Sequence, residues 1–119
     1  MGTERVTVLL VDDTEMVRDL TKGILESRGF SVLTAAGGQE ALGLLEREAT
    51  RIDLLMTDLQ MPDMGGRELV RLARARRPDL RVLYLSGSSP DPPDDGVPCL
   101  VKPFTIDGLL VAIAAALAP

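Results

Sequence analysis

Residues 6–11 read V-T-V-L-L-V, and Asp12-Asp13 follows them at once. The run is continuous, apolar and rich in β-branched residues, which is typical of a strand buried on both faces. The segments after it alternate between helical and extended patterns. The sequence therefore predicts an α/β fold in which helices cover both faces of a parallel sheet.

Eight further elements are expected downstream of this run. The expected strands are residues 30–35, 53–57, 80–85 and 99–101. The expected helices are residues 14–28, 39–48, 66–77 and 106–117, the last of them capped by Thr105. Residues 87–98 read G-S-S-P-D-P-P-D-D-G-V-P, and their four prolines exclude interior helical geometry. We therefore expect the fourth helix of the alternation to be absent or reduced to a Pro-rich loop.

Composition restricts what this chain can do. Its 119 residues suffice for one compact domain, 1–119, and are too few for two. The net charge of −5 argues against direct nucleic-acid binding, because phosphate backbones attract basic surfaces. The absence of histidine excludes a catalytic triad, a histidine-based zinc site and a phosphohistidine carrier. The single Cys99 suits a reducing compartment, and no apolar run approaches the ~20 residues that span a bilayer, so we expect a cytoplasmic location without membrane insertion.

Polar side chains stand where the expected strands end: Asp12-Asp13, Asp58, Ser86 and Lys102. In an open parallel sheet these ends meet at one edge, where ligands bind. Crowded carboxylates repel one another unless a cation neutralises them, and oxygen ligands without histidine or cysteine favour Mg²⁺ or Mn²⁺. Asp58 could act there as a nucleophile that forms an aspartyl phosphate. The metal and Lys102 would offset the phosphoryl charge, and Ser86 could donate a hydrogen bond to it.

Three features of the sequence allow more than one interpretation. Asp12-Asp13 could be a helix-capping pair ahead of Thr14. The arginines of residues 66–77 could form a nucleic-acid patch, although the acidic net charge favours a solvated helix face. Cys99 is expected to be a small buried strand residue rather than a redox thiol.

Four motifs, in order along the chain, carry a resemblance to a known family. They are V-D-D at 11–13, D-L-Q-M-P-D-M-G-G at 58–66, L-S-G at 85–87 and K-P-F at 102–104. With them the chain resembles the receiver domains of two-component response regulators. The resemblance implies a flavodoxin-like, doubly wound, five-stranded parallel sheet of strand order 2-1-3-4-5. It also implies transfer of a phosphoryl group from a histidine kinase or a histidine phosphotransfer protein onto Asp58, with the domain catalysing only its own phosphorylation and dephosphorylation.

The resemblance also assigns roles to the residues at the strand ends. Asp13 and Asp58 would bind the metal directly, together with the backbone carbonyl of Gln60, and Asp12 would act mainly through water. Ser86 occupies the position of the family's switch hydroxyl. Lys102 would contact the phosphoryl group, ahead of a cis peptide bond at Pro103.

Two features depart from the family pattern. Cys99 stands where receivers usually carry a tyrosine or phenylalanine, and the Pro-rich segment 87–98 replaces the usual fourth helix. Such a domain would suit a receiver inside or beside a hybrid histidine kinase, docking through its first helix and the Phe104 loop. The sequence leaves the oligomeric state open.

Two other functions are compatible with parts of the pattern. One is a receiver-shaped docking module that is not phosphorylated. The other is a small aspartyl-phosphate phosphatase of the haloacid dehalogenase type. That family requires Asp-x-Asp-x-Thr after its first strand, whereas Asp58 is followed by Leu59-Gln60-Met61.

Overall fold

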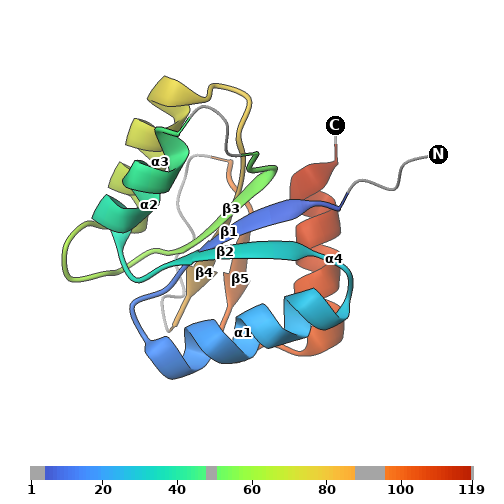
Figure 1. Ribbon diagram of the computed structural model, residues 1–119. Helices are drawn as coiled ribbons and strands as arrows, with labels where there is room; N and C mark the ends of the chain where they lie inside the picture. Colours follow the sequence, from blue (N-terminus) through green and yellow to red (C-terminus); the bar gives the residue numbers. More distant parts are fainter. Residues whose placement is uncertain (1–4, 48–50, 88–95, 119) are drawn as a thin grey trace.

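The computed structural model describes residues 5–47, 51–87 and 96–118 (Figure 1). The strands are β1 (Thr7–Val11), β2 (Ser31–Ala35), β3 (Leu54–Asp58), β4 (Arg81–Ser86) and β5 (Cys99–Val101). The helices are α1 (Glu15–Ser27), α2 (Gly38–Leu45), α3 (Gly66–Arg76) and α4 (Ile106–Leu117).

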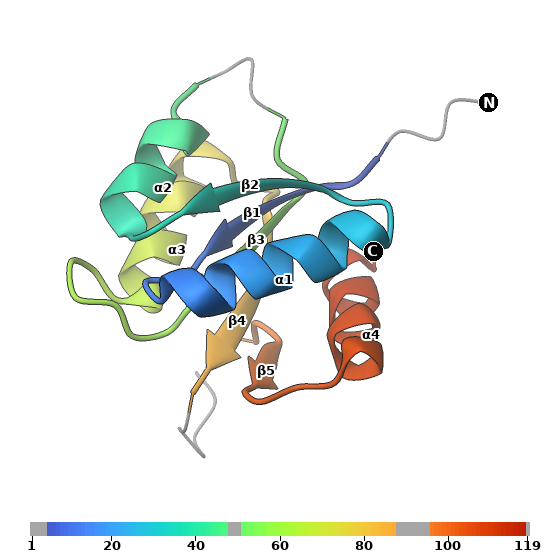
Figure 2. The same ribbon diagram turned by 60° about the horizontal axis from the view of Figure 1, so that its bottom comes forward.

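The strands form one parallel sheet in the order β2-β1-β3-β4-β5, as the resemblance implies. Helices α1 and α4 lie on one face of this sheet, and α2 and α3 lie on the other (Figures 1 and 2). The fold is therefore the doubly wound α/β architecture predicted from the sequence.

Strand β1 shows why its sequence is apolar after Thr7. Val8 and Leu10 pack into the core beneath α1 and α4, whereas Leu9 and Val11 pack into the core beneath α2 and α3. All four side chains are fully buried. The part of a strand that is covered on both faces has no room for polar side chains, which is the pattern that residues 8–11 show.

Some element boundaries differ from the predicted ones. Strands β3 and β4 each begin and end one residue later than expected, so Asp58 and Ser86 are the last residues of their strands. Helix α2 begins one residue earlier and ends at Leu45, before the predicted end at residue 48, which lies outside the described residues. Helix α4 has the predicted bounds, and the Thr105 hydroxyl accepts a hydrogen bond from the Gly108 amide at 2.9 Å.

The predicted Pro-rich replacement for a helix falls on a segment whose residues 88–95 lie outside the described residues. The helix labelled α4 follows β5 and is the one predicted over 106–117. Among the described residues, no helix has the length and apolar character needed to cross a membrane.

Candidate functional site

Parallel pairing brings the predicted site residues to one edge of the sheet. Val11 pairs with Thr57. Asp12 and Asp58 are the residues that follow this pair, so both lie at the same edge of the sheet, at the ends of β1 and β3. Asp58 in turn pairs with Leu85, and Ser86 pairs with Val101. Lys102 follows β5 directly, so each strand except the edge strand β2 delivers a polar side chain to this edge.

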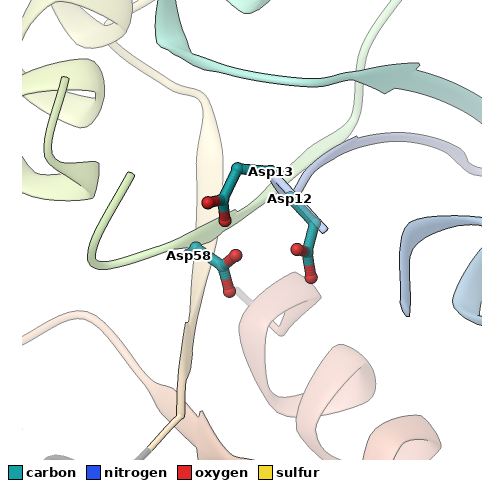
Figure 3. A group of neighbouring side chains, drawn as sticks. All are labelled: Asp12, Asp13 and Asp58. Carbon is teal, nitrogen blue, oxygen red and sulfur yellow. The ribbon is translucent and has the colours of Figure 1, made fainter. Parts of the chain in front are cut away.

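Three carboxylates meet at this edge. One oxygen from each of Asp12, Asp13 and Asp58 lies within 4.8 Å of the other two. Figure 3 shows Asp12 and Asp13 together after β1, with Asp58 beside them at the end of β3. Asp12 and Asp58 are buried, whereas Asp13 is exposed. The cluster therefore combines two desolvated acids with one that water reaches freely.

Lys102 joins the two buried acids. Its Nζ donates hydrogen bonds to Asp12 Oδ2 at 2.8 Å and to Asp58 Oδ1 at 2.7 Å. Burial disfavours the ammonium, but these two carboxylates outweigh that effect, so the pKa of Lys102 lies above its ordinary value of 10.5. The residue is thus a fixed positive charge shared between the carboxylates.

Asp58 is held in an unfavourable environment for a charged group. Burial raises its pKa from the ordinary value of 3.8 to about 7; the hydrogen bond from Lys102 lowers it, and the neighbouring Asp12 raises it further. Desolvation is thus only partly offset by the single ammonium. A further cation would relieve the remaining cost.

Asp12 also stabilises the turn between β1 and α1. Its Oδ1 accepts a hydrogen bond from the Thr14 amide at 2.9 Å, while Oδ2 accepts from Lys102. Arg18 Nη1 donates to the Asp12 carbonyl at 2.8 Å, so the first turn of α1 is fastened to the same residue. Asp12 therefore belongs to the acid cluster and stabilises the turn that leads into α1, whereas the helix-capping interpretation is wrong, because no side chain among the described residues caps α1.

A cavity of about 680 Å³ opens beside the cluster. Asp13, Asp58, Gln60, Ser86 and Lys102 all line it, so all the predicted site residues except the fully buried Asp12 face this space. The peptide bond between Lys102 and Pro103 is cis, as expected.

Sequence reasoning missed two charged residues that line the same cavity. Arg67 and Glu68 stand in the first turn of α3, which the sequence assigned to a solvated face. Glu68 does pair with Arg71, at 2.7 Å, on the exposed side of that helix. The available signal was their position directly after Gly65-Gly66, where α3 leaves the edge of the sheet.

The donor set fits a hard divalent cation. Its ligand atoms are carboxylate oxygens, with no sulfur or imidazole nitrogen in the cluster, and Mg²⁺ prefers one or two carboxylates plus water and phosphate oxygens. Asp13 and Asp58 both offer a carboxylate to the cavity, and Gln60 also lines it. The excess of carboxylates over the single ammonium supplies the attraction.

Comparison with known proteins agrees with this geometry. Residues 8–114 match the family described as "Response regulator receiver domain". The chain is 36% identical over 113 residues to the sensor kinase CckA of Brucella abortus, covering 90% of this chain and 12% of the kinase. It is 39% identical over 123 residues to the transcriptional regulatory protein GlrR of Escherichia coli, covering 98% of this chain and 27% of that protein. The chain thus spans about an eighth and a quarter of these relatives.

A solved structure supports the same assignment. The receiver domain of the hybrid histidine kinase CckA superposes with a TM-score of 0.82 at 36% identity, covering 94% of this chain and 99% of that domain. Family match, fold and arrangement of strand-end residues lead to one conclusion. The chain belongs to the response regulator receiver domain family of two-component systems.

Proposed function

We propose that this domain accepts a phosphoryl group on Asp58 from a phosphohistidine, in a reaction that depends on Mg²⁺ or Mn²⁺. The observation that carries the proposal is the environment of Asp58, which is buried at the wall of a cavity, 2.7 Å from the Lys102 ammonium and beside two further carboxylates. A carboxylate so placed is desolvated, oriented and open to a phosphodonor on one side.

The proposed step is a displacement at phosphorus. An oxygen of Asp58 forms an O–P bond as the N–P bond of the phosphohistidine breaks, and the imidazole leaves with the electron pair and gains a proton. Lys102 would compensate charge on the phosphoryl oxygens, and Ser86 would donate a hydrogen bond to one of them; both residues line the cavity, which supports these roles. The divalent cation, held by Asp13, Asp58 and the Gln60 carbonyl, would supply further positive charge at this point. The domain would act on itself only and not turn over a separate substrate.

The proposed donor is a histidine kinase or a histidine phosphotransfer protein. Two of the relatives are named as sensor kinases, which supports such a partner. Met16 and Leu20 on α1 are 80% and 66% exposed, and α1 begins directly after the cavity-lining Asp13-Thr14. These two side chains offer an apolar contact surface for the partner on the helix that follows the cavity-lining residues.

One experiment separates this proposal from the two alternatives. The chain is incubated with a small phosphodonor such as acetyl phosphate, with Mg²⁺ or with EDTA, and its intact mass is measured. A phosphoacceptor gains one hydroxylamine-sensitive phosphoryl group only with Mg²⁺. A phosphatase would consume a phosphoester substrate catalytically, and a docking module would show neither result.

A further inference from the structure

Helix α2 begins without a capping side chain of its own. Its N-cap residue is Gly37, and the first amides of the helix would lack partners if only local residues were available. They are capped instead by Asp63, which lies 25 residues away in sequence from Gly38. Its Oδ1 accepts from the Gly38 amide at 3.3 Å and its Oδ2 from the Gln39 amide at 3.0 Å.

The chain leaves room for this long-range cap. A Cβ atom at Gly37 would lie 2.8 Å from both carboxylate oxygens of Asp63, and one at Gly38 would lie 2.8 Å from the sulfur of Met64. Any side chain at either position would therefore push Asp63 and Met64 away from α2. Met64 is partly buried and packs against the core beneath α2 and α3. The two glycines of α2 therefore allow Asp63 and Met64 to approach the start of the helix closely.

Asp63 belongs to the segment that connects the phosphoacceptor strand to α3, residues 59–65, here termed the β3–α3 loop. The base of this loop is fixed: the Gly66 amide donates to the Leu59 carbonyl at 2.8 Å, and the Leu59 amide donates to the Leu85 carbonyl at 3.0 Å. A Cβ at Gly66 would overlap the Asp58 carbonyl oxygen, so the two ends of the loop close tightly. Gln60 lies between this base and the point at which Asp63 binds α2.

We propose that Asp63 is a positioning residue, which anchors the β3–α3 loop to the N-terminus of α2 and so holds the Gln60 carbonyl at the cation pocket. The role of Gln60 in this inference rests on the proposed function. Asp63 does not line the cavity and its side chain is exposed, so it acts through the loop and not as a ligand. The hydrogen bond from the Gln39 amide lowers the pKa of Asp63, which is consistent with a carboxylate that stays ionised in this contact.

The test compares Asp63→Ala and Asp63→Asn with a matched control, Glu40→Ala. Glu40 Oε1 accepts from the amide of Ala36, the residue before the N-cap Gly37, at 2.9 Å, so Glu40 also holds the start of α2 but makes no hydrogen bond to the β3–α3 loop. Mg²⁺ affinity is measured by calorimetry, and exchange of the Gly66 and Gly38 amides is measured without metal. Asp63→Asn retains one carbonyl acceptor and serves if the alanine variant does not fold.

Asp63→Ala should raise the Mg²⁺ dissociation constant roughly tenfold, while Glu40→Ala should change it by less than about twofold, because only the first variant releases the loop. Asp63→Asn should fall between them. Exchange at Gly66 should accelerate in Asp63→Ala and not in Glu40→Ala. Equal Mg²⁺ affinities in the two alanine variants would overturn the inference while leaving the proposed function intact. If the wild-type chain binds no Mg²⁺, the proposed function fails. The anchoring role is tested separately, because an unchanged exchange rate of the Gly66 amide in Asp63→Ala would overturn it.

Discussion

Asp58 and Asp63 lie five residues apart on the same stretch of chain, yet the protein treats them in opposite ways. Asp58 is buried, and burial raises its pKa to about 7. Asp63 is exposed, and the hydrogen bond from the Gln39 amide lowers its pKa below the ordinary 3.8. Folding thus disfavours the charge of the first aspartate and favours the charge of the second.

This contrast distinguishes a carboxylate that can react from one that stabilises the fold. A carboxylate kept in a desolvated site at the expense of stability is available for chemistry, and such perturbed groups gather at functional sites. A carboxylate that caps a helix stabilises the fold and gains nothing from reacting. Two aspartates, one at the end of β3 and one in the β3–α3 loop, therefore have different roles, and their surroundings determine which role each has.

The largest effect is expected from removing the Lys102 ammonium, which is hydrogen-bonded to both Asp12 and Asp58. Lys102→Met keeps the aliphatic stem but leaves Asp12 and Asp58 facing each other, so it should destabilise the metal-free protein by about 3 kcal/mol. Urea unfolding in EDTA measures this loss, with Lys22→Met on α1 as the control. Adding Mg²⁺ should reduce this loss of stability. The same substitution in an Asp58→Asn background should lower the free energy of unfolding by a smaller amount. A loss of equal size in both backgrounds would contradict the shared-charge account.

Asp13 should matter for the cation and not for the metal-free fold. Because its side chain is exposed and lines the cavity, Asp13→Ala should leave unfolding in EDTA nearly unchanged. The Mg²⁺ dissociation constant should rise about tenfold, which reduces the stabilisation by saturating Mg²⁺ by about 1.4 kcal/mol. Asp19→Ala, an exposed acid on α1, is the control. Equal Mg²⁺ shifts for both variants would place the cation elsewhere.

Neutralising Asp58 should stabilise the metal-free protein. Asp58→Asn removes a charge whose burial the fold resists, so its free energy of unfolding at pH 7 should rise by about 1 kcal/mol in EDTA. The carbonyl oxygen of asparagine still accepts from Lys102. A destabilised variant would mean that the ion pair outweighs the cost of burial.

The smallest effect is the pH dependence that Asp63 contributes. Since the pKa of Asp63 is lower in the folded than in the unfolded chain, its stabilising effect is present above pH 3.8 and is lost as the pH falls through the folded value. The free energy of unfolding of the wild type should exceed that of Asp63→Asn by about 0.5 kcal/mol at pH 7, and this difference should close as the pH falls below 3.8. Unfolding curves of the two proteins from pH 7 to pH 3 measure it. A difference that does not change with pH would mean that the negative charge of Asp63 does not contribute to capping α2.

The parts of the site that could be predicted follow from topology. A strand buried on both faces must be apolar until it leaves the sheet, so Asp12, Asp58 and Lys102 stand out where their runs end. Parallel pairing then requires those ends to meet. The order of the strands came from the resemblance and was confirmed by the pairing.

The remaining features depend on contacts that no local pattern records. Nothing near Gly37 indicates a cap supplied from Asp63, because the two segments meet only after α2 and α3 pack on the same face. The double use of Asp12, by the Thr14 amide and by Lys102, likewise requires coordinates.

The most direct test of the division between the two aspartates is the intact mass of three proteins after equal exposure to acetyl phosphate and Mg²⁺. Wild type should gain one hydroxylamine-sensitive phosphoryl group, Asp63→Asn should gain the same group more slowly, and Asp58→Asn should gain none. A full phosphoryl group on Asp58→Asn, or its absence from wild type, would contradict the account.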